Sequence, residues 1–207
     1  MLILTLLAIM VGLALGLLGG GGSILAVPAL TYLAELPPKQ AIATSLVLVG
    51  STSLLALVPY ARRGHVEWRT GALFAVAAMG GGYLGGVGAR WFSGRVLLLL
   101  FAVMMLITGI AMFKGRRALA PSRPAQLPVR WVLIEGLFVG AVTGLVGAGG
   151  GFLVVPALVI LGGMEMHKAV GTSLLVIALK SFAAFSGHAS HVEIDIQLTL
   201  VITIAAA

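Results

Sequence analysis

The residue with the most unusual chemistry for its surroundings is Lys180. It lies midway along an apolar run, residues 174–187, and a lysine at the centre of a membrane helix costs at least about 2.5–3.5 kcal/mol on insertion scales. A charge kept at that cost predicts a function, here the electrostatic binding of an anion. Two other interpretations stay open: the ammonium reaches toward lipid head groups, or it pairs with Glu135.

Two glycine-rich stretches form the second set of candidates. Each glycine inside a helix costs about 1 kcal/mol relative to alanine, so we expect the helices to break there. At membrane depth, non-helical backbone is tolerated only where it is buried in protein or lines a water-filled cavity. A helix that resumes after such a break offers free N–H groups and a positive dipole end to an anion. The predicted binding residues are Gly19, Gly20, Gly21, Gly22, Ser23, Gly147, Gly149, Gly150 and Gly151.

Close helix packing is the alternative role for glycine. We prefer it for two other pairs at a spacing of four, Gly81 with Gly85 and Gly82 with Gly86, because this pattern is typical of contacts between membrane helices.

Hydroxyl pairs follow each glycine stretch. They either donate to a bound anion or bond back to a carbonyl one turn earlier in their own helix, and both roles stay open. The four residues are Thr44, Ser45, Thr172 and Ser173. Pro28 and Pro156, which lack a backbone donor, are expected to shape the short apolar segments 24–34 and 152–163.

Other site chemistry is not indicated. The sequence has no cysteine, no catalytic triad, and no lysine after the glycines as a phosphate loop requires. His188, His191 and Glu193 have the types of metal ligands, but we interpret this stretch as a solvated loop. Glu135 could couple protons, although a place near the membrane interface fits it better. We therefore expect no enzymatic activity, no metal and no cofactor.

The composition requires a membrane. Of 207 residues, 60% are hydrophobic and 9% are charged, against about 25% charged in soluble domains. Runs long enough to span a bilayer as helices recur along the chain. They lie near residues 2–18, 41–60, 71–89, 96–113, 131–146, 169–187 and 196–207.

The net charge of +7 does not indicate nucleic-acid binding, because no recognition motif accompanies it. The basic residues fall between the spans, as topology-setting charges do. They gather at 62–69, at 90–95 and in a linker at 114–130.

The chain is duplicated. Residues 16–30 align without a gap with residues 144–158, a shift of 128 positions that also carries 41–46 onto 169–174. We predict a first repeat at 1–113, a cytoplasmic linker at 114–130 and a second repeat at 131–207, which ends before the counterparts of the first repeat's last helices.

The two repeats are expected to be inverted. The loop at 62–69 holds three arginines, whereas its counterpart at 188–197 holds no lysine or arginine, and positive charge marks the cytoplasmic side. A glycine-rich hairpin followed by three spans gives each repeat the odd number of crossings that inversion needs. The arginines at 90 and 95 would then be external, against the rule. The expected fold is an all-α polytopic membrane protein in which each repeat opens with a broken helix.

These motifs resemble the TauE/SafE family of sulfite-exporter-like permeases. The resemblance rests on the repeated Gly-x-x-Gly-x-Gly-Gly-Gly-x-x-x-x-Pro-x-Leu pattern, the Ala-x-x-Thr-Ser-Leu that follows it, and Val66-Glu67-Trp68. It covers the chain apart from the linker, with Ser23 in place of the last glycine of the first pattern.

The resemblance implies a multi-pass transporter of a bacterial inner membrane. Its substrates would be small sulfur-containing anions such as sulfite, thiosulfate or organosulfonates, moved by alternating access. A passive anion channel or a structural membrane subunit is the alternative. The expected partners are the small anion and membrane lipid, with no nucleic acid; assembly as a homo-oligomer stays open.

Overall fold

The computed structural model describes residues 23–115, 129–147, 149–161, 163–192 and 196–206. Within these ranges the regular structure is entirely helical, which confirms the all-helical part of the predicted fold class. The elements are α2 (Ser23–Tyr32), α3 (Pro38–Arg62), α4 (Trp68–Gly88), η2 (Ala89–Trp91), α5 (Gly94–Gly115), α6 (Val129–Val146), α7 (Gly151–Pro156), the π-helical η3 (Ala157–Leu161), α8 (Met166–Ala189) and α9 (Ile196–Ala206).

Four of the described helices are long and apolar enough to cross a membrane, namely α3, α4, α6 and α8. They match four of the predicted spans. The run at 96–113 forms most of α5, a helix of 22 residues. The run at 196–207 forms the short helix α9. The run at 2–18 lies outside the described residues.

Proline and glycine place several helix ends. Pro38 occupies the first turn of α3, where its missing N–H costs no hydrogen bond. Gly64 follows α3 with a φ of +71°, a left-handed conformation that favours glycine. Pro156 ends α7, and the chain continues as the wider π-helical turn of η3 because proline cannot donate to the α-helical ladder.

Helix α4 packs between α6 and α8 through two glycine rows. A Cβ on Gly81 or Gly85 would collide with the backbone of α6, and one on Gly86 would collide with the backbone of α8. A Cβ on Gly82 would lie 3.2 Å from the Lys180 carbonyl oxygen in α8. The prediction that these glycines serve close packing is confirmed: bare backbone brings three helices together, as in other membrane bundles.

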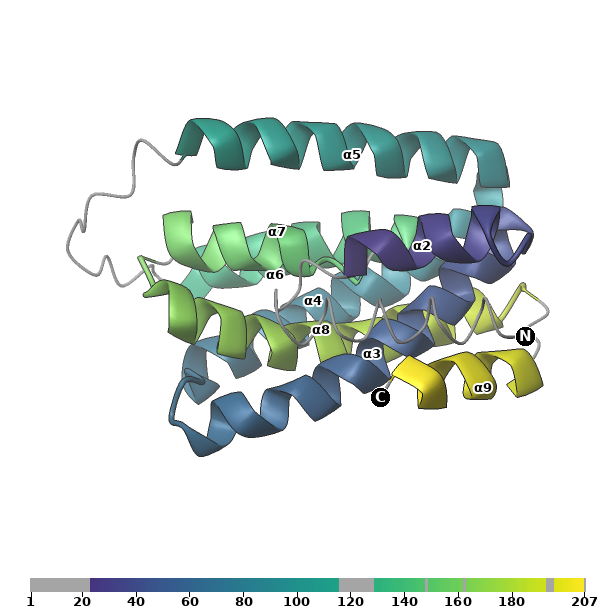
Figure 1. Cartoon of the computed structure of the whole chain (residues 1–207). Coiled ribbons are helices and arrows are strands. Elements are labelled where there is room, and N and C mark those ends of the chain that lie inside the picture. The colour runs from purple at the N-terminus through teal and green to yellow at the C-terminus, as the bar shows by residue number, and fades with distance from the viewer. Residues whose placement is uncertain (1–22, 116–128, 148, 162, 193–195, 207) are drawn as a thin grey trace.

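Helices α3 and α8 are matched by the duplication, and they run in opposite directions (Figure 1). Their contacts agree with the view: Gly171, near the start of α8, lies against Tyr60 and His65 at the end of α3, whereas Gly50 in the middle of α3 lies against Ser181. The equivalent short helices α2 and α7–η3 also point toward opposite ends of the bundle (Figure 1).

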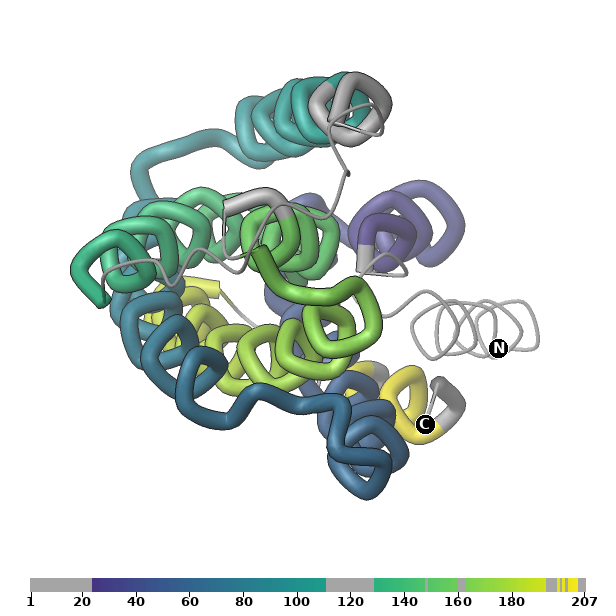
Figure 2. Tube along the Cα trace, turned by 90° about the vertical axis from the view of Figure 1, so that its left-hand side faces the viewer, coloured from purple at the N-terminus to yellow at the C-terminus, as the bar shows by residue number. Residues whose placement is uncertain are grey.

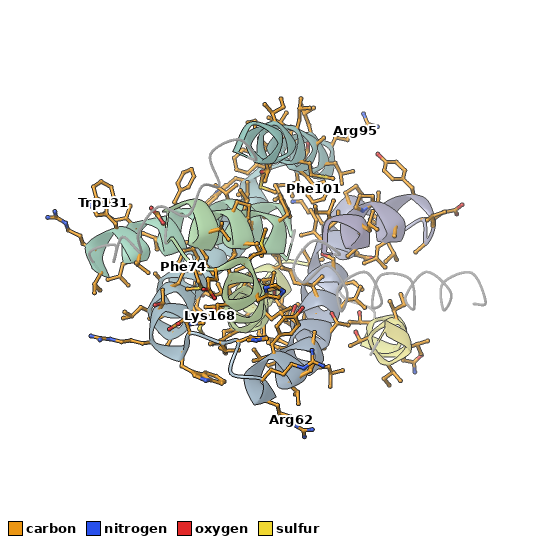
Figure 3. All side chains as sticks on the ribbon, turned by 60° about the vertical axis from the view of Figure 1, so that its left-hand side comes forward. Arg62, Phe74, Arg95, Phe101, Trp131 and Lys168 are labelled. Carbon is orange, nitrogen blue, oxygen red and sulfur yellow. The ribbon has the colours of Figure 1, made fainter. Side chains whose placement is uncertain are left out.

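The outer helices carry the apolar surface. Seen along the bundle, α5 and α9 lie at its edges (Figure 2). Phe101 points from α5 toward the bundle, whereas Arg62 and Trp131 point outward (Figure 3). On the outside of α5, Leu99 and Leu106 are each 64% exposed. A surface of this kind is suited to lipid, not water.

Basic residues lie at both ends of the bundle. The end at the left of Figure 1, where α3 ends and α4 begins, holds Arg62, Arg63 and Arg69, and we call it the arginine-rich end. The opposite end holds Lys39, at the start of α3, and Arg90, in η2.

Candidate functional site

The second glycine stretch breaks the helix as predicted. Helix α6 ends at Val146 and α7 begins at Gly151. Between them, Gly147 and Gly150 adopt φ values of +69° and +71°, the left-handed region that side chains disfavour. The glycines described in this turn, Gly147, Gly149 and Gly150, are all buried, so the non-helical backbone lies within protein, where a membrane protein tolerates it.

Lys180 contacts this break. Its side chain is fully buried, and Nζ donates to the hydroxyl oxygen of Thr143 in the last turn of α6. The Thr143 hydroxyl in turn donates to the carbonyl of Val139 at 2.7 Å, which leaves its lone pairs for the ammonium. A Cβ on Gly150 would lie only 2.6 Å from Nζ. The absence of a side chain at Gly150 is therefore what admits the lysine.

The ammonium of Lys180 lies where its positive charge is stabilised. The carboxyl end of a helix carries partial negative charge from its unpaired carbonyls, and Thr143 lies in that final turn of α6. The predicted alternative partner, Glu135, lies two turns earlier in α6 and is half-buried. Among the described residues, Glu135 forms no ion pair with Lys180. The ion pair found there joins Lys168 to Glu67 at 3.2 Å.

The first repeat also contributes to this break. Ser45 Oγ lies 2.8 Å from the carbonyl oxygen of Gly147 and 2.7 Å from that of Ile42 in its own helix, so its single proton serves one of them at a time. A Cβ on Gly147 would collide with the side chain of Ile42. The two roles expected of Ser45, facing the glycine turn and bonding back to its helix, thus occur at one hydroxyl.

The other predicted hydroxyls lie elsewhere or face their own helix. Thr172 Oγ1 accepts the backbone N–H of Glu67 at 2.9 Å, toward the arginine-rich end. Ser173 bonds back to the carbonyl of Val170, and Thr44 Oγ1 lies 3.5 Å from the Thr199 hydroxyl. Contact of these residues with an anion stays a prediction.

The first glycine stretch, Gly19 to Gly22, lies outside the described residues, and Ser23 begins α2. The starts of the two short helices nevertheless share one apolar cluster. Val27 from α2 and Phe152 from α7 pack there with Ile42 from α3 and Val146 from α6. The cluster therefore joins both repeats beside the second break.

His188 corrects one prediction. We expected it in a solvated loop, but α8 continues to Ala189 and buries the ring completely. Its Nε2 lies 2.9 Å from the carbonyl oxygen of Gly144 in α6. That carbonyl belongs to the last turn, where the helix itself supplies no donor, so His188 caps α6. No group of potential metal ligands occurs among the described residues.

Sequence reasoning missed Thr143 and misplaced His188, which it assigned to a loop. Both contact the break from positions that pattern alone does not single out, since a threonine bonding within its helix and a histidine after an apolar run are common. The one available signal for His188 was its nearness to Gly187, because a glycine in the last turn of α8 lets that helix approach α4 closely.

Known proteins with similar sequences are membrane transporters or probable membrane transporters. The profile of the family "Sulfite exporter TauE/SafE" matches residues 4–207. A "Probable membrane transporter protein" of Xylella fastidiosa is 38% identical over 190 residues, covering 90% of this chain and 73% of that protein. The "Probable membrane transporter protein YunE" of Bacillus subtilis is 26% identical, covering 96% and 82%.

A "Probable membrane transporter protein MJ0441" of Methanocaldococcus jannaschii is 26% identical over 197 residues, covering 90% of this chain and 73% of that protein. No solved structure matches the chain. The match to the family profile extends over nearly the whole sequence. The chain is a multi-pass membrane protein, not an enzyme, and it belongs to the TauE/SafE family of membrane transporters.

Proposed function

We propose that this protein is a secondary carrier of small sulfur-containing anions, such as sulfite, thiosulfate or organosulfonates. The observation that carries the proposal is the fully buried ammonium of Lys180 beside the left-handed turn at Gly150. The name of the family, sulfite exporter, supports the choice of substrate class.

Lys180 has capacity to bind an anion. An ammonium carries three N–H donors, and the hydroxyl of Thr143 takes one of them. Among the described residues no carboxylate pairs with this lysine. A buried cation without a counter-ion is costly, and an anion bound at the break would supply the missing charge. The predicted site residues Gly147, Gly149 and Gly150 would then present backbone to the same anion.

We also propose that the two repeats are inverted, with the boundaries expected from the sequence: 1–113, a linker at 114–130, and 131–207. The opposite directions of α3 and α8, and of α2 and α7–η3, support this arrangement. So does the crossing of α3 and α8, where Gly50 contacts Ser181. Thr52 and Lys180, which are equivalent positions in the two repeats, lie within one turn of that contact.

The proposed location is the inner membrane of a bacterium, with the arginine-rich end in the cytoplasm. Three arginines gather at that end of α3 and α4, in keeping with the positive-inside rule. Arg90 and Arg95 at the opposite end are the counter-examples, and the guanidinium of Arg90 stacks 4.2 Å above the ring of Trp91. Such a pair suits the membrane interface on either side.

Uptake of labelled sulfite and thiosulfate into proteoliposomes tests the function. The wild-type protein should show saturable transport. Lys180→Met keeps the length of the side chain and removes its charge, so it should abolish transport. The matched control is Thr52→Val at the equivalent position of the first repeat, which removes a hydroxyl that bonds within its own helix at 2.8 Å and should leave transport intact.

Two results would contradict the proposal. Saturable transport that survives in Lys180→Met would remove the lysine from the site. Flux that rises linearly with anion concentration would indicate a channel, and the absence of any flux would favour a structural role in the membrane.

A further inference from the structure

His188 is a buried titratable residue that anion binding at Lys180 does not explain. Its ring is fully buried near the end of α8. Nε2 faces the carbonyl oxygen of Gly144 at 2.9 Å, and a carbonyl only accepts, so Nε2 must carry a proton. The neutral ring then has its lone pair on Nδ1, and Nδ1 has no hydrogen-bond partner among the described residues.

A buried nitrogen without a hydrogen-bond partner is costly, and such a group in a native structure often has a functional role. We propose that His188 is the proton-binding residue of the transporter, and that a proton taken up at Nδ1 travels with the anion. The step balances: one proton from solvent forms the Nδ1–H bond, and neutral imidazole becomes imidazolium, whose charge offsets that of the anion. This inference rests on the proposed function.

The groups around His188 explain why proton binding would be unfavourable in the absence of the anion. His191 lies beside it with ring centroids 5.6 Å apart. The charge of Lys39 in α3 acts on both rings, and that of Arg90 in η2 acts on His191. Burial, together with those two positive charges, lowers the pKa of His191, which lies beyond the end of α8. The last turn of α6 presents a carbonyl and no titratable side chain.

An imidazolium at His188 would therefore add positive charge to positive surroundings. An anion bound near the break offsets this positive charge. Anion and proton therefore each strengthen the binding of the other, and linkage makes the two effects equal. Gly144 supplies the connection. It opens the glycine pattern, and its carbonyl contacts His188, while the next residue before it, Thr143, contacts Lys180.

Only the second repeat carries these two groups. The duplication places Tyr60 opposite His188 and Thr52 opposite Lys180. The proton site and the anion site thus lie in one repeat, and both act on the last turn of the same helix, α6.

The first experiment uses the wild-type protein and thiosulfate, which stays fully ionised near neutral pH, so any proton taken up is bound by the protein. Calorimetry in two buffers of different ionisation enthalpy counts those protons. We expect about one proton per bound thiosulfate, as linked binding predicts. Binding without proton uptake would overturn this inference alone. Absence of thiosulfate binding would overturn the proposed function and this inference together.

The second experiment identifies the residue. In His188→Gln, the amide nitrogen replaces Nε2–H toward Gly144, but the side chain cannot take up a proton. We expect thiosulfate exchange in proteoliposomes to continue while proton movement falls to the background of empty vesicles. The control is His65→Gln. The segment His65-Val-Glu67 repeats as His191-Val-Glu193 once the alignment slips by two residues, and His65 lies near His167 at the arginine-rich end. Proton movement that persists in His188→Gln would refute the assignment.

Discussion

The contact between Gly150 and Lys180 gives the most quantitative prediction. Gly150→Ala adds a methyl group that meets Lys180 Nζ at 2.6 Å and Thr143 Cγ2 at 2.8 Å. The substitution has two costs. A residue with a Cβ in the left-handed region costs about 1–2 kcal/mol. Displacing the ammonium from Thr143 removes a hydrogen bond to a charged group, worth about 1.5–3 kcal/mol. The free energy of unfolding should fall by about 2.5–5 kcal/mol.

The chain provides a matched control for the first cost. Gly64 has the same φ of +71°, and a Cβ there would meet nothing within 4 Å. Gly64→Ala should therefore cost only the backbone part, about 1–2 kcal/mol. The difference between the two variants measures the effect of crowding Lys180 and Thr143 together.

Reversible unfolding in detergent micelles measures both variants, and a third background completes the test. In a Lys180→Ala background, the destabilisation caused by Gly150→Ala should be smaller by about 1.5–3 kcal/mol, because no ammonium remains to be displaced. The two positions are in contact, so their effects should not be additive. Equal costs at Gly64 and Gly150, or additive effects of the two changes, would refute the inference that the missing Cβ admits the lysine.

Three further predictions concern packing and polar contacts, and thermal unfolding in detergent measures each. Gly85→Ala pushes a methyl into the backbone of α6 and should cost at least about 1–3 kcal/mol, whereas Gly109→Ala meets open space and should be neutral or stabilising. Thr172→Val leaves a part-buried N–H without its acceptor, at about 1–3 kcal/mol, while Glu67→Gln breaks a half-exposed ion pair worth less than about 1 kcal/mol. Ser45→Ala removes a donor to the break and should cost about 0.5–1.5 kcal/mol. Equal effects within either pair, or no effect at Ser45, would contradict these assignments.

The helical class and four of the spans could be predicted because length and apolarity determine them physically. A run of about 20 apolar residues has few alternatives to a membrane helix. The break at Gly147–Gly150 followed from the cost of glycine in a helix. The choice of Lys180 as a candidate functional residue followed from the energetic cost of a charge inside an apolar span.

The partners of these residues could not be predicted, since they depend on which helices become neighbours. The sequence places Thr143 and Lys180 on separate helices, and nothing in their spacing brings them together. The same holds for His188 and Gly144. The loop assigned to His188 was wrong because polar residues nearby suggested a helix end, whereas contacts with α4 and α6 carry α8 two residues past Gly187.

The glycine rows of α4 have a mechanical consequence. Helix α4 lies in the predicted first repeat, and the helices it contacts, α6 and α8, lie in the predicted second repeat. Backbone touches backbone at Gly81, Gly85 and Gly86, where no side chain is present that could change rotamer to absorb a sliding or tilting motion. The three helices must therefore move as one stiff body that crosses the boundary between the repeats. A cycle that rocks one whole repeat against the other would have to pull this body apart, so we expect any moving parts to lie among the helices around it.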